Sequence, residues 1–386
     1  MMEEHMWLGF TLFGMKSKIK LSFRDILGCR NLRRKMKKLV NSNYMWRVIF
    51  TFMVVLSHYP YIDHSNASYY IGVDYFFIFS GLMIAYSIEV NGKVSVFEFT
   101  YKRIKKLYPH IWFSFFAFYG FLCIGDSAKS IIAGMIGYLY QIIPMMYYVL
   151  PNNCVKGYLN FPVWYISVML IDGLVVYYLY SKHKSFCIYL VSPTVVLSGW
   201  YFFVHNSNSF NNGATLGLFT NVSYIRGFTD MFCGIILYRM IIEIKKIKFT
   251  KVSYIVFRVT ELLSFVVLCY ALRKYGNSCN DIYFVLIICI IIVASFIYED
   301  EQAGLFSKFK KINDFMYPVY LNHLFCIYVA SEMPQYVSLV KYNKLVALIV
   351  YFIALLIYSF ITMKLLALIQ VLIHKTRRLF INDVNE

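Results

Sequence analysis

Charge is scarce in this sequence: only 15% of its 386 residues are Asp, Glu, Lys or Arg, whereas 60% are hydrophobic. A soluble chain of this composition would have too little polar surface to cover its apolar side chains. Apolar runs of membrane-spanning length recur from Tyr44 to the C-terminus, and no polar stretch is long enough to form a soluble domain. The composition therefore predicts an all-α fold, a polytopic bundle of transmembrane helices.

Acidic residues are scarcer than basic ones, 20 against 38, so the net charge is +18. Such an excess can indicate nucleic-acid binding. In a membrane protein it indicates cytoplasmic loops that are rich in Lys and Arg. We therefore expect the lipid bilayer, and not nucleic acid, as a partner.

Metal-binding and secretory signals are also missing. The nine cysteines show no CxxC or Cys/His spacing, so we interpret them as packing residues and expect no metal. Cys154 and Cys279 lie outside the apolar spans, and whether they pair stays open. No small-residue cleavage site follows an apolar segment near the start, so we expect a basic arm at 1–43 and not a signal peptide. Two interpretations of this arm stay open, a segment along the cytoplasmic membrane surface and a disordered tail.

Ten apolar segments are expected to cross the membrane within a domain at 44–373, followed by a cytoplasmic tail at 374–386. The predicted spans are 44–62, 71–90, 107–125, 161–180, 186–204, 224–242, 252–271, 281–298, 315–333 and 345–373. With ten crossings every basic loop, including SKHKS at 181–185, falls on one side together with both termini. The positive-inside rule makes that side cytoplasmic. An eleventh apolar stretch, 131–150, would break this pattern, so we predict a re-entrant or interfacial element there.

Arg47 and His58 are the first candidate site residues. They are eleven positions apart, a near-whole number of helical turns, so both should lie on one helix face about 16 Å apart. An ionisable residue at membrane depth is costly unless it is paired or faces a polar cavity. His58 could act as a general base near neutral pH, or could be a structural histidine bonded to a backbone carbonyl. Arg47 could equally be an interfacial anchor.

Asp74 opens the next apolar segment and could orient the imidazole of His58, as carboxylates do in catalytic triads, or could cap a helix. The loop that follows this segment carries Lys102, Arg103 and Lys106. Arg and Lys side chains bind phosphates well, although a solvated topogenic loop would have the same composition.

Two further intramembrane groups lie later in the chain. Arg226 and Asp230 are four residues apart and could neutralise each other, and Arg226 lies where it could also contact a sugar. His323, in FMYPVYLNHLF, could be structural or could contact substrate.

Several of these segments together resemble a known family. RVIFTFMVVLSH, GVDYFFIFSG and FEFTYKRIKKLYP resemble, in order and spacing, the opening motifs of the membrane-bound acyltransferase-3 family. WYISVMLIDGLVVYY, RGFTDMFCGIILY and FMYPVYLNHLF resemble its later blocks. Members of this family are ten-span bacterial and animal proteins that transfer acyl groups, usually acetyl, to sugars and other hydroxyl acceptors.

The resemblance implies roles for individual residues. Arg47 and His58 match the family's essential Arg–His pair, with His58 catalytic, and Arg103 matches the first member of a cytoplasmic arginine pair. The second member of that pair is Lys106 here, and Met169 stands where relatives often have Glu. The Lys is expected to weaken bidentate contact with phosphate. With Met169 in place of Glu, no acid is expected to act at that position.

The first functional hypothesis is therefore an O-acetyltransferase of the bacterial cytoplasmic (inner) membrane. It would move acetyl from acetyl-CoA to a hydroxyl of a cell-surface polysaccharide or lipid-linked sugar acceptor. The alternative is an exporter or flippase of a glycan or lipid intermediate, in which the same polar residues line a pathway. Transporters usually show inverted repeats or paired broken helices, and this sequence shows neither.

Overall fold

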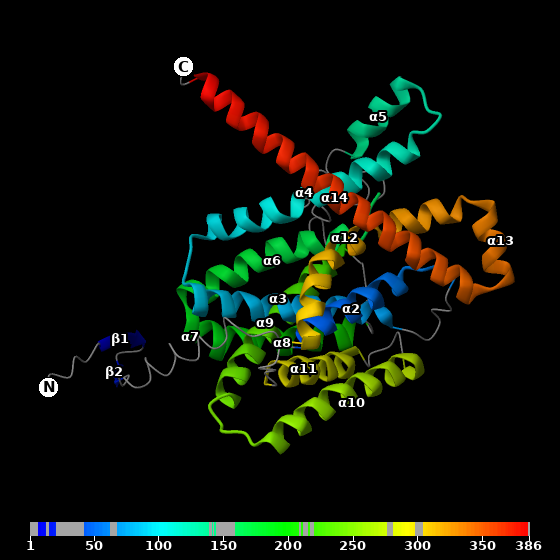
Figure 1. Ribbon diagram of the computed structural model, residues 1–386. Coiled ribbons are helices and arrows are strands. Elements are labelled where there is room, and N and C mark those ends of the chain that lie inside the picture. Colours follow the sequence, from blue (N-terminus) through cyan, green and yellow to red (C-terminus); the bar gives the residue numbers. More distant parts are fainter. Residues whose placement is uncertain are drawn as a thin grey trace.

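Long helices make up most of the chain that the computed structural model describes. The described residues are 7–12, 15–20, 42–61, 68–138, 141, 143, 159–207, 210, 215–216, 220–275, 281–297 and 304–384. The long helices are α2 (Asn43–Ser57), α3 (Gly72–Asn91), α4 (Val96–Leu122), α6 (Val163–Lys182), α8 (Ser192–Phe202), α9 (Val222–Ile244), α10 (Lys251–Tyr275), α11 (Asp281–Ile297), α12 (Gly304–Ser331) and α14 (Lys344–Val384). Figure 1 shows α3, α4 and α6 running alongside one another, α14 crossing them at an angle, and α10 and α11 together on the opposite side of the bundle from α4.

A helix lies at each of the ten ranges that the sequence predicted as spans. By length and composition, five of the described helical stretches can cross a membrane: Tyr69–Asn91, Val163–Lys182, Lys184–Asn206, Lys251–Tyr275 and Lys344–Ile373. α2 and α11 are apolar but shorter. The helical fold class is therefore confirmed, and the count of ten crossings stays a prediction.

The shorter elements lie between or beside these helices. They are the strands β1 (Trp7–Leu12), β2 (Met15–Lys20), β3 (Thr215–Leu216) and β4 (Thr220–Asn221), the 3-10 turn η1 (Tyr69–Ile71), α5 (Ala128–Tyr138), α7 (Lys184–Phe186), the π-helical turns η5 (Cys187–Val191) and η6 (Phe203–Ser207), and α13 (Pro334–Tyr342). β1 and β2 form an antiparallel hairpin that the sequence analysis did not predict. The alternation in MKSKIK is typical of a strand.

The element predicted at 131–150 is only partly described. α5 begins at Ala128 and ends at Tyr138, so it has 11 residues, about half of what a crossing needs. Residues 139–140, 142 and 144–158 lie outside the described part of the chain, as do Cys154 and Cys279. α5 is therefore too short to span by itself, and the re-entrant assignment stays a prediction.

The basic segment before Pro109 is helical, although the sequence analysis treated it as a loop. Ser95 caps the N-terminus of α4, its hydroxyl accepting a hydrogen bond from the backbone N–H of Glu98 at 3.0 Å. Ser followed three residues later by Glu is a capping-box sequence, which is a signal for a helix start. α4 therefore begins at Val96, and its first turns carry Lys102, Arg103 and Lys106.

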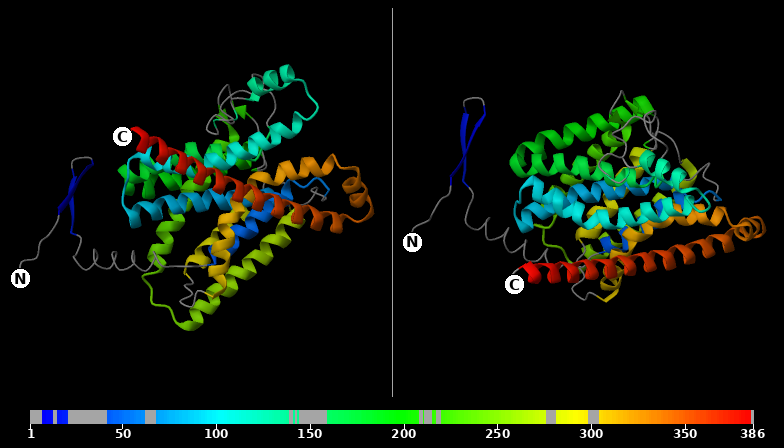
Figure 2. Two further views of the ribbon diagram at one scale, coloured as in Figure 1. Left: turned by 45° about the horizontal axis from the view of Figure 1, so that its top comes forward. Right: turned by 90° about the horizontal axis from the view of Figure 1, so that it is seen from above.

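Consecutive helices run in opposite directions, so their termini gather at two ends of the bundle. We call the end that holds His58 and Gly72 the His58 end, and the opposite end, where α3 stops at Asn91 and α4 begins, the Gly92 end. α6 begins at the His58 end, since Phe161 contacts the His58 ring, and it ends near Glu89 at the Gly92 end. Figure 1 shows that α14 continues past the bundle, and the right view of Figure 2 shows this helix along one side of the bundle.

The closest helix contact in the described core is between α3 and α9. A Cβ atom on Gly81 would collide with the backbone of Met231, and one on Gly234 would collide with the carbonyl of Ile78. Small residues let transmembrane backbones approach in this way. α3 is therefore held in the centre of the bundle, with α2, α6 and α11 packed on its other faces.

A buried acidic network fixes α2 against α10 at the Gly92 end. Glu261, fully buried, accepts hydrogen bonds from Ser42 and from the indole N–H of Trp46, and it forms an ion pair with Arg258 at 2.6 Å. Arg258 and Glu261, three residues apart on α10, therefore form a structural ion pair.

Candidate functional site

His58 is the C-cap residue of α2, directly after Ser57. Its ring Nδ1 lies 2.9 Å from the carbonyl oxygen of Val54 and 3.2 Å from the hydroxyl of Ser57. A carbonyl only accepts hydrogen bonds, so Nδ1 carries the proton in the neutral ring. Nε2 then has the lone pair that could accept a proton from a substrate.

A second histidine faces this ring. The rings of His58 and His323 have centroids 5.0 Å apart and are tilted by 55°. His323 is fully buried in α12, and its Nδ1 donates to the carbonyl of Tyr320 at 2.5 Å. Its Nε2 is buried and has no hydrogen-bond partner within the described residues. An unpartnered ring nitrogen in a core is costly, so such an atom is expected where a ligand or a proton is bound.

Hydrogen bonds from several helices fix the part of α12 that carries His323. Tyr351 of α14 donates to the carbonyl of His323 at 3.2 Å, and Asn322 donates to Thr362 at 3.0 Å. Asn160, just before α6, donates to the carbonyl of Leu321 at 2.9 Å. The position of His323 is therefore set by α6, α12 and α14 together.

Arg47 lies on α2, closer to the Gly92 end. Its guanidinium carbon is 5.4 Å from the centre of the Phe79 ring of α3, a cation–π contact. The hydroxyl of Tyr165 on α6 lies within electrostatic reach of both Arg47 and Arg103. The Tyr165 ring in turn lies 5.9 Å from the ring of Tyr320, which is 5.8 Å from that of His323. A series of aromatic side chains thus connects the two arginines with the histidine pair.

The three basic residues of α4 that the sequence analysis named do not point the same way. Arg103 turns inward, where its guanidinium stacks on Phe99 at 4.4 Å. Its Nη1 is buried without a hydrogen-bond partner in the described structure, and only the absence of a side chain at Gly173 leaves room for it. Lys106 is exposed, and Lys102 is exposed and paired with Glu98 at 2.7 Å. The predicted cluster is therefore divided between one buried guanidinium and lysines on the surface.

Asp74 is paired with Arg226, not with His58. The Arg226 Nε donates to Asp74 Oδ1 at 2.7 Å and its Nη2 donates to Oδ2 at 2.5 Å, a bidentate pair that is almost completely buried. Arg226 also donates to the carbonyls of Tyr70 and Phe210, both at 3.2 Å. The structure thus commits Asp74 and Arg226 to joining α3 and α9, while the Val54 carbonyl orients His58. The sequence did not suggest the pairing of Asp74 with Arg226, because the two residues are 152 positions apart. A backbone carbonyl as the partner of His58 was one of the two interpretations that the sequence left open.

Asp230, one turn further along α9, is the second carboxylate near this pair. It lies close enough to Asp74 and Arg226 to interact with both charges. Neither of its oxygens has a hydrogen-bond partner among the described residues. Asp230 and Arg226 therefore share a helix face as predicted, although the direct ion pair of Arg226 is with Asp74.

Some buried polar residues were not singled out from the sequence. Asp172 of α6 is fully buried against Gly227, and neither oxygen has a hydrogen-bond partner in the described chain. An acid inside an apolar span is itself a signal, so Asp172 could have been found. Tyr165 could not, because one tyrosine in an aromatic-rich span carries no distinguishing pattern. Within the described residues no group of three His, Cys, Asp or Glu side chains could hold a metal ion.

The comparison with protein families matches the acyltransferase-3 model, described as an acyltransferase domain, over residues 45–367. Comparisons with curated proteins and with solved structures found no match. The matched region runs from the start of α2 through most of α14, and it includes both histidines, Arg47 and Arg103. Together with its apolar helices, this match shows that the chain is a multi-pass membrane acyltransferase and a member of the acyltransferase-3 family.

Proposed function

We propose that this protein is an O-acetyltransferase that moves acetyl from acetyl-CoA to a hydroxyl group of a cell-surface polysaccharide or its lipid-linked precursor. The observation that carries the proposal is the histidine pair, in which the ring of His58 faces that of His323. The Nε2 of His323 is buried and has no hydrogen-bond partner among the described residues. Hydroxyl groups are poor nucleophiles until a base removes their proton. A site for O-acylation needs such a base at the place where the acceptor enters.

In this proposal the acceptor hydroxyl approaches His58, whose Nε2 takes its proton as the oxygen attacks the thioester carbon. The C–O bond forms, the C–S bond breaks, and the thiolate of CoA leaves and is protonated. His323 contacts the acceptor or the imidazole from the buried side. A positioned base contributes about 10²–10⁴-fold to the rate of such a step.

The donor binds at the Gly92 end. The exposed Lys102 and Lys106 of α4 contact the phosphates at the membrane surface, and Arg103 contacts a negative group deeper in the bundle. Arg47 extends the positive potential toward Tyr165. The acyl arm of the donor would therefore extend inward along α3 and α6, toward the histidine pair.

The proposed location is the bacterial inner membrane, with the Gly92 end and both termini on the cytoplasmic side. Exposed basic residues at the Gly92 end, such as Lys106, Lys182 and Lys248, support this orientation. Acyl-CoA would then reach its site from the cytoplasm, and a glycan would reach His58 from the outer side.

NMR of the host's surface glycans, with and without the gene, tests the proposal. Loss of O-acetyl signals on deletion, restored by the wild-type gene and not by His58→Gln, is the expected result. Membranes that contain the protein should also release CoA from acetyl-CoA only when acceptor is present. Unchanged glycan acetylation together with altered glycan export would instead support the exporter hypothesis.

A further inference from the structure

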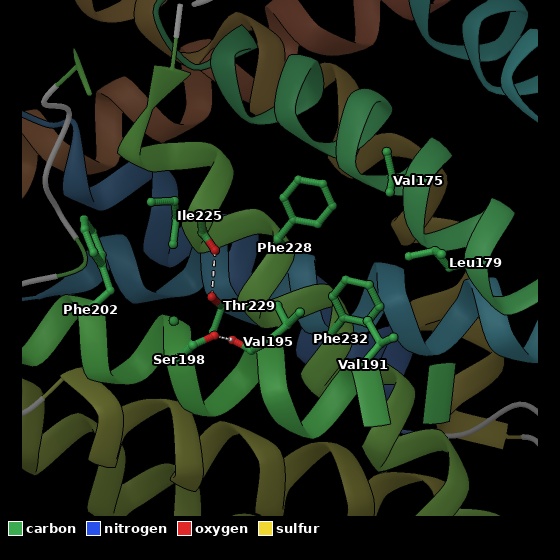
Figure 3. Close-up of a pocket in the computed structure, with 11 residues that line it drawn as sticks. Val175, Leu179, Val191, Val195, Ser198, Phe202, Ile225, Phe228, Thr229 and Phe232 are labelled. Atoms are coloured by element: carbon green, nitrogen blue, oxygen red, sulfur yellow. Dashed lines mark hydrogen bonds between the residues drawn. The ribbon is translucent and has the colours of Figure 1, made fainter. Parts of the chain in front are cut away.

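A groove of about 430 Å³ lies between α6, α8 and α9. Figure 3 shows side chains from all three helices converging on it. The residues that line it are Val175, Leu179, Val191, Val195, Ser198, Gly199, Phe202, Ile225, Phe228, Thr229 and Phe232. Because Phe202 and Ile225 belong to the His58 end while Leu179 belongs to the Gly92 end, the groove extends along the helix axes.

The groove offers almost no hydrogen-bonding groups to a ligand. Among the described residues that line it, only Ser198 and Thr229 carry hydroxyls, and both donate to backbone carbonyls of their own helices. The Thr229 bond to the Ile225 carbonyl and a bond from Ser198 are drawn in Figure 3. A polar ligand would lose its hydration without gaining partners. The lining therefore favours a hydrocarbon chain.

The shape of α8 produces the groove. Pro193 has no N–H to donate, and the preceding turn, η5, is a π-helix closed by a bond from the N–H of Ser192 to the carbonyl of Cys187. Two turns later Gly199 brings α8 against Thr229, where a Cβ atom would collide with that side chain. The helix is thus wider near Val191 and packs tightly against α9 at Gly199. This leaves space between α8 and its neighbours α6 and α9.

The groove opens on a face that is expected to contact lipid. Leu197 and Tyr201, on the outer side of α8, are 65% and 64% exposed. The stretch Lys184–Asn206 can cross a membrane by length and composition. A hydrocarbon chain of the bilayer can therefore enter the groove from the side.

A basic mouth lies at the Gly92 end of the groove. Val175, Leu179 and Lys182 are spaced four and three residues apart, so they share one face of α6 and Lys182 lies directly beyond the groove. Lys182 is exposed, as is its neighbour His183, and Lys182 makes no ion pair with a described residue. The nearby Lys184 is different because it is paired with Glu89 at 2.6 Å. The positive charge of Lys182, which forms no ion pair with a described residue, thus lies at the end of the apolar groove.

We propose that this is a binding site for an anionic phospholipid of the membrane leaflet at the Gly92 end. One acyl chain lies in the groove between α6, α8 and α9, and the phosphate group contacts Lys182 and His183. Basic residues between transmembrane helices commonly bind anionic head groups in this way. A bound lipid would fill the space between α8 and α9 and thereby stabilise their contact at Gly199.

Native mass spectrometry of the purified full-length protein tests the site, with dioleoyl phosphatidylglycerol and dioleoyl phosphatidylcholine as probes. The wild-type protein should retain phosphatidylglycerol in preference to phosphatidylcholine. Lys182→Gln should raise its Kd about fivefold, which corresponds to the ~1 kcal/mol expected for one basic side chain near a head group. Lys248→Gln removes another exposed Lys at the same end and should leave the Kd unchanged.

Ser198→Phe fills the groove and should reduce retention of both lipids. Leu197→Phe is the matched control, because it adds bulk at the adjacent position, outside the groove. Equal retention by all variants would overturn the site. A loss in Lys182→Gln without any loss in Ser198→Phe would overturn the groove assignment, and binding without a preference for phosphatidylglycerol would overturn the head-group assignment.

Discussion

His58 shows how a backbone hydrogen bond can prepare a side chain for chemistry. The Val54 carbonyl accepts a hydrogen bond from the Nδ1–H group, so Nε2 keeps the lone pair that the proposed base needs. The sequence analysis left two roles open for Asp74, orienting His58 or capping a helix, and its carboxylate instead binds Arg226. A carboxylate next to His58 would have held a positive imidazolium more strongly than a carbonyl does. A neutral carbonyl suits a base that has to release its proton again.

We predict that His58→Gln lowers glycan acylation by about 10²–10⁴-fold while the protein still accumulates in the membrane. Gln can replace one hydrogen bond but cannot take a proton at neutral pH. The measurement is acetyl transfer to purified acceptor by membranes with matched protein levels. His323→Ala should cause a smaller loss. His205→Gln, at an exposed histidine of η6, should cause none. Near-wild-type transfer by His58→Gln would make His58 a structural histidine.

Arg103 and Lys106 belong to the same turn of α4 but differ in surroundings, since the Nη1 of Arg103 is buried and Lys106 is exposed. We predict that the double variant Arg103→Ala, Lys106→Ala raises the KM for acetyl-CoA. Phosphate contacts act mainly in donor binding, so kcat should change less. Initial rates over a range of donor concentrations measure both values.

Lys248→Ala serves as the control for loss of a basic residue at the same end of the bundle. Donor dependence identical to wild type in the Arg103, Lys106 variant would show that these residues only set the topology.

At the scale of elements, α3 is the helix that brings the site together. It contacts α2 with Phe50 stacked on Tyr75 at 4.2 Å, and α6 with Phe77 against Tyr165 at 4.6 Å. Its contact with α9 depends on glycines, because the backbones touch at Gly81 and Gly234. In lipid this close packing is a main source of helix association, since lipid tails are as apolar as the helices.

We predict that Gly81→Ala destabilises the bundle by about 1–3 kcal/mol or more, because the added methyl group collides with backbone atoms that cannot rotate away. Thermal unfolding in detergent, followed by size-exclusion chromatography, measures the loss. Gly120→Ala is the matched control, since a Cβ atom there meets no other atom within 4 Å. If both variants melt at the same temperature, α3 and α9 are not packed as the structure shows.

At the scale of the whole molecule, the distribution of charge distinguishes the two ends of the bundle. The exposed lysines of α4, those where α6 ends and α7 begins, and those of the segment after α9 all lie at the Gly92 end. The buried charges lie deeper: the Asp74–Arg226 pair joins α3 to α9, and Glu261 joins α10 to α2. A membrane protein can hold such charges in its interior because they are paired there.

We predict that the Gly92 end and both termini are cytoplasmic. A green fluorescent protein fused to the C-terminus should fluoresce, and a cysteine at position 183 should react with a membrane-impermeant reagent only after the cells are opened. A cysteine at position 332, between α12 and α13 at the His58 end, should react in intact cells. Labelling of position 183 in intact cells would reverse the topology and make 131–150 a crossing.

The positions of the helices were determined by the sequence alone, because membrane spans are defined by local hydrophobicity and length. For this reason all ten predicted ranges contain a helix. The family was also evident from local motifs, since RVIFTFMVVLSH and GVDYFFIFSG keep their spacing along the chain. The helical start of α4 was present in the Ser95–Glu98 capping box and was overlooked.

The partners of the polar residues were decided only by the tertiary structure. Asp74 lies 16 positions after His58 and 152 before Arg226, yet it is bound to Arg226. His323 faces His58 because α12 packs against α2, and Arg103 turns inward because Gly173 leaves space on α6. Helix periodicity shows which residues share a face but not which helix that face meets. In a bundle whose helices are apolar on most sides, only the packing of small residues and the pairing of buried charges select the neighbours.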